Sequence, residues 1–136
     1  MKLAIKNLTR RPVPPIAFRT IAESVLGADY ELSLVLVGDT RSRAINRRWR
    51  GQDRPANVLS FPLDRKAGEI FLNLGRYSIN YLRFLFIHGL LHLKGLRHGS
   101  KMGSLESQLA KYFQTHGQND RHRTRHRQRH RPSRCL

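Results

Sequence analysis

The chain has 136 residues and a mass of 15.8 kDa, a length that fits one domain. Lys and Arg total 26 against 9 acidic residues, which gives a formal net charge of +17. No apolar run approaches the roughly 20 residues that a membrane span needs, and the first residues lack the apolar segment of a secretory signal. The single cysteine, Cys135, excludes a disulfide framework. These features predict a cytoplasmic protein that acts on a polyanion and uses no membrane.

The first predicted elements are a strand, a helix and a second strand. Apolar and polar residues alternate over Met1–Asn7, which predicts a strand. A Pro-rich connector follows, and Pro15 is expected in the first turn of a helix that stops at Gly27. The predicted buried face of that helix consists of Phe18, Ile21, Ala22 and Val25. Tyr30–Val37 carries apolar residues on both faces and is predicted as a central strand.

A second helix is predicted to begin at Asp39 or Thr40, either of which can cap it, and to run to about Trp49. Its inward face is expected to hold Ala44, Ile45 and Trp49. On this interpretation the tryptophan belongs to the core and is not a surface for stacking bases.

Two further strands are predicted over Asn57–Phe61 and Glu69–Leu74. Gly68 is expected to separate the second strand from a turn at Asp64–Ala67. Ser60, which has no neighbouring base in the sequence, is interpreted as an ordinary strand hydroxyl.

Two helices complete the predicted fold. Tyr77–Lys94 is apolar almost all round, which indicates a buried helix, and Ser104 is expected to cap the last helix. The apolar residues of that last helix are Leu105, Leu109, Tyr112 and Phe113. The sum is a single α+β domain over residues 1–116, with about four strands in a mixed sheet and about four helices.

The buried helix carries the residues that indicate chemistry. His88 and His92 are four residues apart, so both imidazoles lie on one helical face. Gly95 suits the positive φ that ends a helix, after which His98 can return to the same ion. This spacing matches the longer zincin signature, H-E-x-x-H-x-x-G-x-x-H. Three imidazoles with one open position are the usual catalytic zinc arrangement, so we predict one divalent ion, zinc, and no small-molecule cofactor.

Two alternatives to a catalytic zinc site would use the same residues. Hydrogen-bonded core histidines would need partners, and no Asp or Glu lies nearby in the sequence. A zinc peptidase would need the Glu of the zincin signature, and Gly89 stands in its place. A metal can still act as a Lewis acid, and the charge of +17 favours a phosphodiester substrate.

An arginine-rich segment, INRRWRGQDRPANVLSFP over residues 45–62, supplies the second part of the predicted site. Arg50 lies where the second helix gives way to Gly51 and is predicted to hold the phosphate oxygens, as the catalytic arginine. Arg47 and Arg48 are interpreted as an exposed helix face. The predicted nucleic-acid contacts are Arg48, Arg54, Arg97, Arg121, Arg123, Arg125, Arg127, Arg129 and Arg131.

The last part of the chain, residues 117–136, is predicted to be a disordered basic tail. Arg121–Leu136 holds seven arginines, three histidines and no acid. Such a segment cannot bury enough apolar surface to fold, but it can attract RNA by releasing counterions. Without it, the remaining 19 basic and 9 acidic residues still leave a surplus of positive charge.

Together the segments HGLLHLKGLRH (residues 88–98) and NRRWRGQDRPANVLSFP (residues 46–62) resemble the YbeY family of bacterial ribosomal RNA maturation factors. That family shows H-G-x-L-H-L-x-G-Y-D-H and a motif close to Y-R-x-x-D-x-P-T-D-V-L-S-F-P. A G-D-I-like element is represented by Gly68-Glu69-Ile70, and the resemblance spans about Leu32–Phe113.

The resemblance implies a zinc-dependent, single-strand-specific endoribonuclease that acts in 16S rRNA 3′-end maturation and ribosome biogenesis. It implies His88, His92 and His98 as metal ligands and Arg50 as the functional arginine. The implied partners are rRNA and the small ribosomal subunit.

This sequence departs from the family pattern at several positions. Leu96-Arg97 replaces Tyr-Asp, Trp49 replaces Tyr, and Ala56-Asn57 replaces Thr-Asp. The lost acid is a candidate acceptor for orienting an imidazole. The alternative function is therefore a non-catalytic RNA- or ribosome-binding assembly factor with a structural metal site, for which His116 is a conceivable fourth ligand.

Overall fold

The computed structural model describes residues 1–95 and 99–116, except for the side chains of Ser100, Thr115 and His116. The elements run in chain order as β1 (Lys2–Asn7), α1 (Phe18–Leu26), β2 (Glu31–Val37), α2 (Asp39–Arg50), β3 (Val58–Asp64), β4 (Ala67–Asn73), α3 (Ile79–Leu93) and α4 (Ser100–His116). The predicted α+β architecture, with four strands and four helices among the described residues, is confirmed.

The four strands form one mixed sheet in the order β1-β2-β4-β3. β2 pairs in parallel with β1 and β4, whereas β3 runs antiparallel to β4. The predicted central place of β2 is confirmed, because its residues on both faces, such as Leu34 and Val35, are buried. β3 is an edge strand and contains Pro62, next to an irregularity in the register between Pro62 and Asp64.

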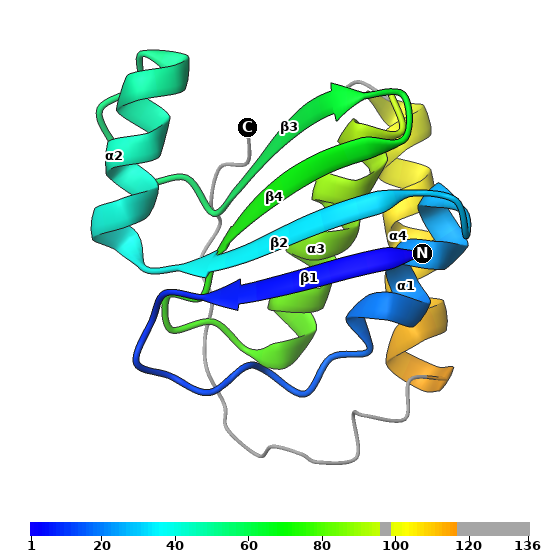
Figure 1. The fold of residues 1–136 in the computed structure, drawn as a ribbon. Helices are drawn as coiled ribbons and strands as arrows, with labels where there is room; N and C mark the ends of the chain where they lie inside the picture. Colours follow the sequence, from blue (N-terminus) through cyan, green and yellow to red (C-terminus); the bar gives the residue numbers. More distant parts are fainter. Residues whose placement is uncertain (96–98, 117–136) are drawn as a thin grey trace.

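The apolar core lies between the sheet and three of the helices. Figure 1 shows α1, α3 and α4 grouped together, whereas α2 stands apart from them beyond the end of β2. Phe18 of α1 and Phe86 of α3 meet edge to face, with ring centroids 4.9 Å apart. Both rings are buried, and the predicted buried face of α1 is confirmed in full. Within the described residues, no helix is long and apolar enough to span a membrane.

Helix α3 begins and ends for local reasons. Ser78 caps it by accepting a hydrogen bond from the Tyr81 backbone N–H at 3.1 Å, so the helix begins two residues later than predicted. Gly95 has a φ of 101°, which confirms the expected stop after Lys94.

Helix α2 contradicts the predicted inward face. Trp49 is 63% exposed, Ala44 is exposed and Ile45 is half-buried. The buried residues are instead polar, Ser42 and Asn46. The Ser42 hydroxyl donates to the Ala56 carbonyl and accepts from the Ala56 N–H at 2.9 Å, and Asn46 Nδ2 donates to the Arg54 carbonyl at 2.8 Å. The prediction failed because hydrogen bonds, not apolar contacts, hold this helix.

The predicted cap of α2 is also wrong. Gly38 occupies the cap position, and no side chain there accepts from the helix backbone. The Asp39 carboxylate accepts instead from Asn73 Nδ2 at 2.7 Å, which ties the start of α2 to the end of β4. Thr40 lies within the first turn and is exposed.

Three smaller predictions need correction. Gly68 lies inside β4, because the turn holds only Arg65 and Lys66. A Cβ at Gly68 would lie 2.5 Å from the Tyr30 hydroxyl, so close packing explains why this residue is a glycine. Pro15 precedes α1, which begins at Phe18. Ser104 lies inside α4, which begins at Ser100.

Candidate metal centre

His88 and His92 of α3 direct their Nε2 atoms toward the same point between the two rings. The Nε2 atoms of His88 and His92 are 3.1 Å apart, and the ring planes meet at 74°. Two imidazoles that bind one tetrahedral ion at about 2.0–2.1 Å hold their nitrogens about 3.3 Å apart. The observed separation therefore fits two ligands of one ion, and the same pair is close enough for a hydrogen bond between the rings.

A buried carboxylate lies on the other side of His88. Glu106 of α4 is 8% exposed, and its Oε2 atom contacts His88 Nδ1. Because an ionised carboxylate only accepts hydrogen bonds, Nδ1 carries the proton in this contact and the Nε2 lone pair faces His92. A carboxylate behind a ligating imidazole is the usual arrangement in metalloproteins, since it fixes the tautomer and the ring orientation. The donor set therefore suits a divalent ion that prefers imidazole, zinc included.

Gly89 is explained by the packing of α3 on the sheet. A Cβ at this position would lie 3.0 Å from Ser60 Oγ, 3.1 Å from Val58 and 3.3 Å from Ile70. The Ser60 hydroxyl also donates to the Gly89 carbonyl at 2.9 Å. The position that holds Glu in zincins therefore faces the sheet, where a carboxylate side chain has no room. The Ser60 hydroxyl therefore has a structural role, in agreement with its interpretation from the sequence as an ordinary strand hydroxyl.

Arg50 contacts Ser60, the residue that packs against Gly89 of α3. Its Nη2 atom donates to the Ser60 carbonyl at 3.2 Å, and its guanidinium carbon lies 5.3 Å from the centre of the Phe61 ring. Gly51, with a φ of 71°, ends α2 directly after it. The structure thus joins Arg50 to α3 through Ser60, whose side chain contacts Gly89 and whose carbonyl contacts Arg50.

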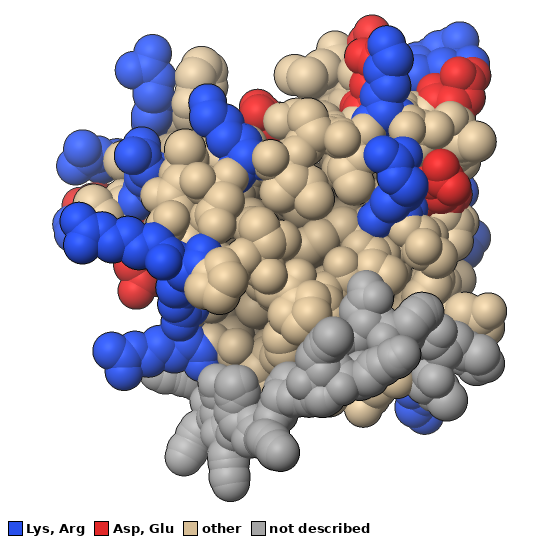
Figure 2. Space-filling model, turned by 60° about the horizontal axis from the view of Figure 1, so that its bottom comes forward, with Lys and Arg blue, Asp and Glu red and all other residues tan. Residues whose placement is uncertain are grey.

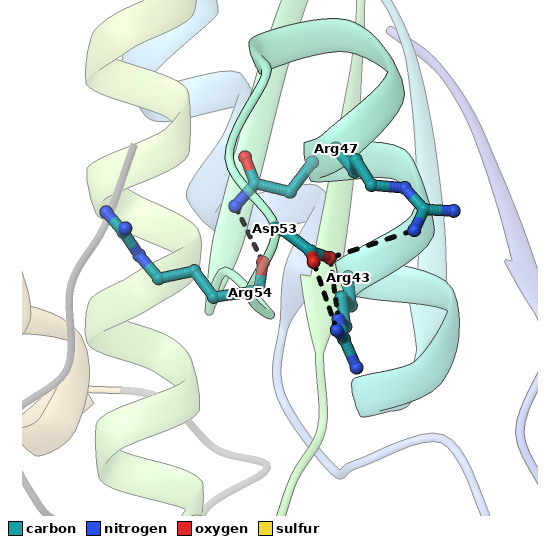
Figure 3. A network of polar contacts seen from close by, with 5 residues as sticks. Arg43, Arg47, Asp53 and Arg54 are labelled. Atoms are coloured by element: carbon teal, nitrogen blue, oxygen red, sulfur yellow. Dashed lines mark hydrogen bonds and ion pairs between the residues drawn. The ribbon is translucent and has the colours of Figure 1, made fainter.

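The arginines near Arg50 fall into two groups. The Asp53 carboxylate accepts from Arg43 in a two-point contact, at 2.8 and 3.1 Å, and lies 3.8 Å from Arg47 (Figure 3). The hydrogen bond from Arg43 lowers the pKa of Asp53 and raises the pKa of Arg43. The Arg54 side chain points away from Asp53 in Figure 3. Asp53 therefore compensates Arg43 and Arg47, and among the described residues Arg54 has no carboxylate partner.

Comparison with known proteins identifies the family of this chain. The family model described as Endoribonuclease YbeY matches residues 10–114. A Geobacter sulfurreducens protein of that name is 33% identical, with 79% of this chain and 87% of the relative covered. A Helicobacter pylori protein of the same name is 37% identical, with 82% of this chain and 91% of the relative covered. This chain belongs to the YbeY family.

A solved structure agrees with the fold of this YbeY-family chain. The solution structure of TM1509 from Thermotoga maritima matches with a TM-score of 0.58 and 23% identity, over 80% of this chain and 87% of that chain. The likeness supports the mixed sheet and the helices around it, and it carries no statement about activity.

Several predicted site residues lie outside the described part of the chain. They are His98, Arg97 and the tail arginines Arg121, Arg123, Arg125, Arg127, Arg129 and Arg131. Within residues 1–95 and 99–116 no cluster of three His, Cys, Asp or Glu is suited to a metal. His98 as the third ligand therefore stays a prediction for this YbeY-family chain, as do the RNA contacts of the tail. The side chain of His116 is likewise not described.

Sequence reasoning missed Glu106, because it searched for an acid close to the histidines along the chain. A usable signal existed in α4. Met102, Glu106 and Phe113 are buried, and their spacing puts them on one helical face. A buried acid needs a partner that donates a hydrogen bond to it. His88, on a buried helix and with no acid near it in the sequence, is a candidate for that partner.

Proposed function

We propose that this chain is a zinc-dependent, single-strand-specific endoribonuclease that acts in 16S rRNA 3′-end maturation and ribosome biogenesis, with the small ribosomal subunit as its partner. The observation that carries the proposal is the 3.1 Å approach of the Nε2 atoms of His88 and His92, with Glu106 behind His88. Membership in the YbeY family, whose curated members are named endoribonucleases, supports the reaction class.

The residues of α3 and α4 would hold and orient the ion. His88 and His92 would bind it through Nε2, His98 would complete the set, and Glu106 would keep the His88 ring in place. A bound divalent ion would supply Lewis acidity, which withdraws charge from the phosphate and makes water nucleophilic near neutral pH. The packing of Gly89 leaves no carboxylate base at the zincin position, so the proton passes to solvent or to a phosphate oxygen of the RNA.

Arg50 would hold the phosphate that is cleaved. One N–H of its guanidinium is used on the Ser60 carbonyl, and the group has five N–H donors in all. The remaining donors can bind the non-bridging oxygens of a phosphodiester, where negative charge grows in the transition state. The contacts with Ser60 and Phe61 fix the guanidinium before the RNA arrives, which lowers the entropy lost on binding.

The test combines metal analysis with RNA cleavage in wild-type protein, His92→Ala and a control variant, His130→Ala. We expect about one equivalent of metal in the wild type and the control, and neither metal nor cleavage in His92→Ala. Full metal occupancy in His92→Ala would refute the site. Metal bound without cleavage of single-stranded RNA or of a 16S rRNA 3′ precursor would favour the alternative, an assembly factor with a structural metal.

Arg50 is tested apart from the metal. Arg50→Ala is expected to keep its metal and its unfolding midpoint, and to lower the cleavage rate by about 10²–10³-fold, as for other residues that bind charge in a transition state. Arg65→Ala is the matched control, because Arg65 is an exposed arginine in the β3–β4 turn. Equal cleavage rates in the two variants would remove Arg50 from the site.

A further inference from the structure

The largest apolar side chain of α2 points into solvent. Trp49 is 63% exposed and is the only tryptophan of the chain. Single exposed apolar residues are common and need no explanation by themselves. Leu63, for instance, is 65% exposed on the edge strand β3. The neighbours of Trp49 set it apart, because it stands between two arginines near the candidate site.

Arginine groups lie on both sides of Trp49 along the chain. The guanidinium carbon of Arg48 lies 5.1 Å from the centre of the indole, within the range of a cation–π contact. Arg50 turns toward Ser60, and Ser60 in turn contacts α3. Trp49 is therefore next in the chain to the arginine that we propose holds the phosphate.

The charge around Trp49 is not compensated. Asp53 is engaged by Arg43 and Arg47, and the other acid of α2, Asp39, lies at the opposite end of the helix. Among the described residues, Arg48 and Arg54 form no ion pair. Figure 2 shows basic side chains gathered along the side of the molecule where α2 lies. A phosphate chain at Trp49 therefore meets the Arg48 guanidinium, which no described carboxylate neutralises.

The way α2 is anchored leaves this surface open. Its buried residues, Ser42 and Asn46, bind the segment that follows the helix, while positions 47–50 are all exposed. In Figure 1 α2 stands away from α1 and α4, so neither of these helices covers it. A flat aromatic ring, an adjacent guanidinium and uncompensated charge are the features by which proteins hold single-stranded nucleic acid.

We propose that Trp49 and Arg48 form a stacking platform for one unpaired base of single-stranded RNA, whose phosphates are held by Arg48 and Arg54. The base stacks on the indole whatever its identity, because every base has a π-face. A base in a duplex is already stacked and paired, so the platform favours single strands. The proposal rests on the proposed function for the choice of RNA as the strand.

The single tryptophan makes the proposal directly measurable, because tryptophan emission, excited selectively over the four tyrosines, reports on Trp49 alone. The full chain is titrated with a short oligouridylate in the presence of EDTA, so that no cleavage occurs. We expect the oligouridylate to quench the emission. An abasic strand of equal length and a duplex of equal charge should bind with little quenching. Equal quenching by the abasic strand would overturn the proposal, since phosphate alone would then account for it.

Variants test the contribution of the ring to affinity. Trp49→Ala should weaken oligouridylate binding by about tenfold or more, with an unchanged salt dependence, and Trp49→Tyr should restore most of it. Arg48→Gln should weaken binding and also reduce the salt slope by about one. Leu63→Ala is the matched control, an equally exposed apolar residue without an arginine against it, and should bind like wild type. Wild-type affinity in Trp49→Ala would refute the platform.

The outcomes separate this proposal from the proposed function. Quenching and a loss of affinity in Trp49→Ala, with no cleavage by the wild type, would support the platform and refute the nuclease. Cleavage by the wild type together with undiminished RNA affinity in Trp49→Ala would support the nuclease and refute the platform. The binding arm contains no metal, so it does not depend on whether the ion is zinc.

Discussion

Helices α2 and α3 are attached to the same domain by opposite kinds of contact. α3 buries nine residues, and Leu85, Phe86 and Leu90 among them are fully buried. α2 buries only Ser42 and Asn46, both through hydrogen bonds. Apolar burial is large and non-directional, whereas a hydrogen bond adds little net stability but fixes an orientation. A helix embedded in the core holds the His88 and His92 side chains firmly, as the proposed metal site requires, whereas a helix held by a few polar groups keeps its remaining surface exposed.

The largest expected difference between the two helices comes from removing one aromatic side chain from each and comparing the free energies of unfolding. Phe86→Ala should lower the free energy of unfolding by about 3–5 kcal/mol, because it leaves a cavity in a closed core. Trp49→Ala should change it by less than about 0.5 kcal/mol, because the ring is 63% exposed. Both changes in the free energy of unfolding would be measured by urea denaturation of the metal-free protein. Equal losses in the two variants would mean that α2 is also part of the core.

The second prediction concerns the polar contact that α3 makes in the core. Glu106→Ala should weaken zinc binding by about 10–100-fold, since His88 loses the carboxylate that orients its ring. Glu106→Gln keeps an acceptor for Nδ1 and should lose less. Competition with a chromophoric chelator measures the affinity, and far-UV circular dichroism checks that both variants are folded. Wild-type affinity in Glu106→Ala would restrict Glu106 to a packing role.

The third prediction tests the anchor of α2. Ser42→Ala removes the hydroxyl that both donates to and accepts from Ala56, so two buried backbone groups lose a partner. We expect a loss of about 1–3 kcal/mol in the free energy of unfolding. Thr40→Ala, at an exposed position of the same helix, is the control and should stay within about 0.5 kcal/mol of wild type. A neutral Ser42→Ala would show that α2 has another anchor.

The smallest expected effect belongs to the exposed pair of Arg43 and Asp53. The hydrogen bond from Arg43 lowers the pKa of Asp53 below its ordinary value of 3.8. A lowered carboxyl pKa stabilises the folded state above pH 3.8, and this contribution is lost as the pH falls through the folded pKa. Asp53→Asn should therefore unfold slightly more easily than wild type at neutral pH, and the difference should vanish in acid. High salt should also reduce it. A difference that grows in acid would contradict this assignment.

The sequence was most informative where apolar residues decide the structure. The spacing of His88 and His92 in a mostly apolar helix was enough to place both rings on one face, and the structure brings their Nε2 atoms together. Glu106 could not be placed in the same way, because its contact with His88 joins two helices that are separated along the chain. The pattern of α4 indicates that Glu106 is buried, but which residue it contacts depends on how the two helices pack.

Prediction failed where polar groups or close packing decide the structure. Trp49 was expected in the core on the assumption that large apolar residues face inward, but α2 is oriented by Ser42 and Asn46. Gly68 was expected to separate the strand from the preceding turn, but it lies inside β4, where a Cβ would be 2.5 Å from the Tyr30 hydroxyl. Side-chain hydrogen bonds orient α2, and the contact of Gly68 is with a residue 38 positions earlier in the chain, so hydrophobicity and turn propensity alone point the wrong way.

The edge strand β3 has a consequence for how molecules of this protein meet one another. Pro62 has no N–H to donate, and Arg50 already binds the Ser60 carbonyl. At these two positions the margin of the sheet offers one fewer donor and one fewer acceptor to a strand from another molecule. The residue that we propose to bind phosphate therefore also hinders intermolecular strand addition at this margin.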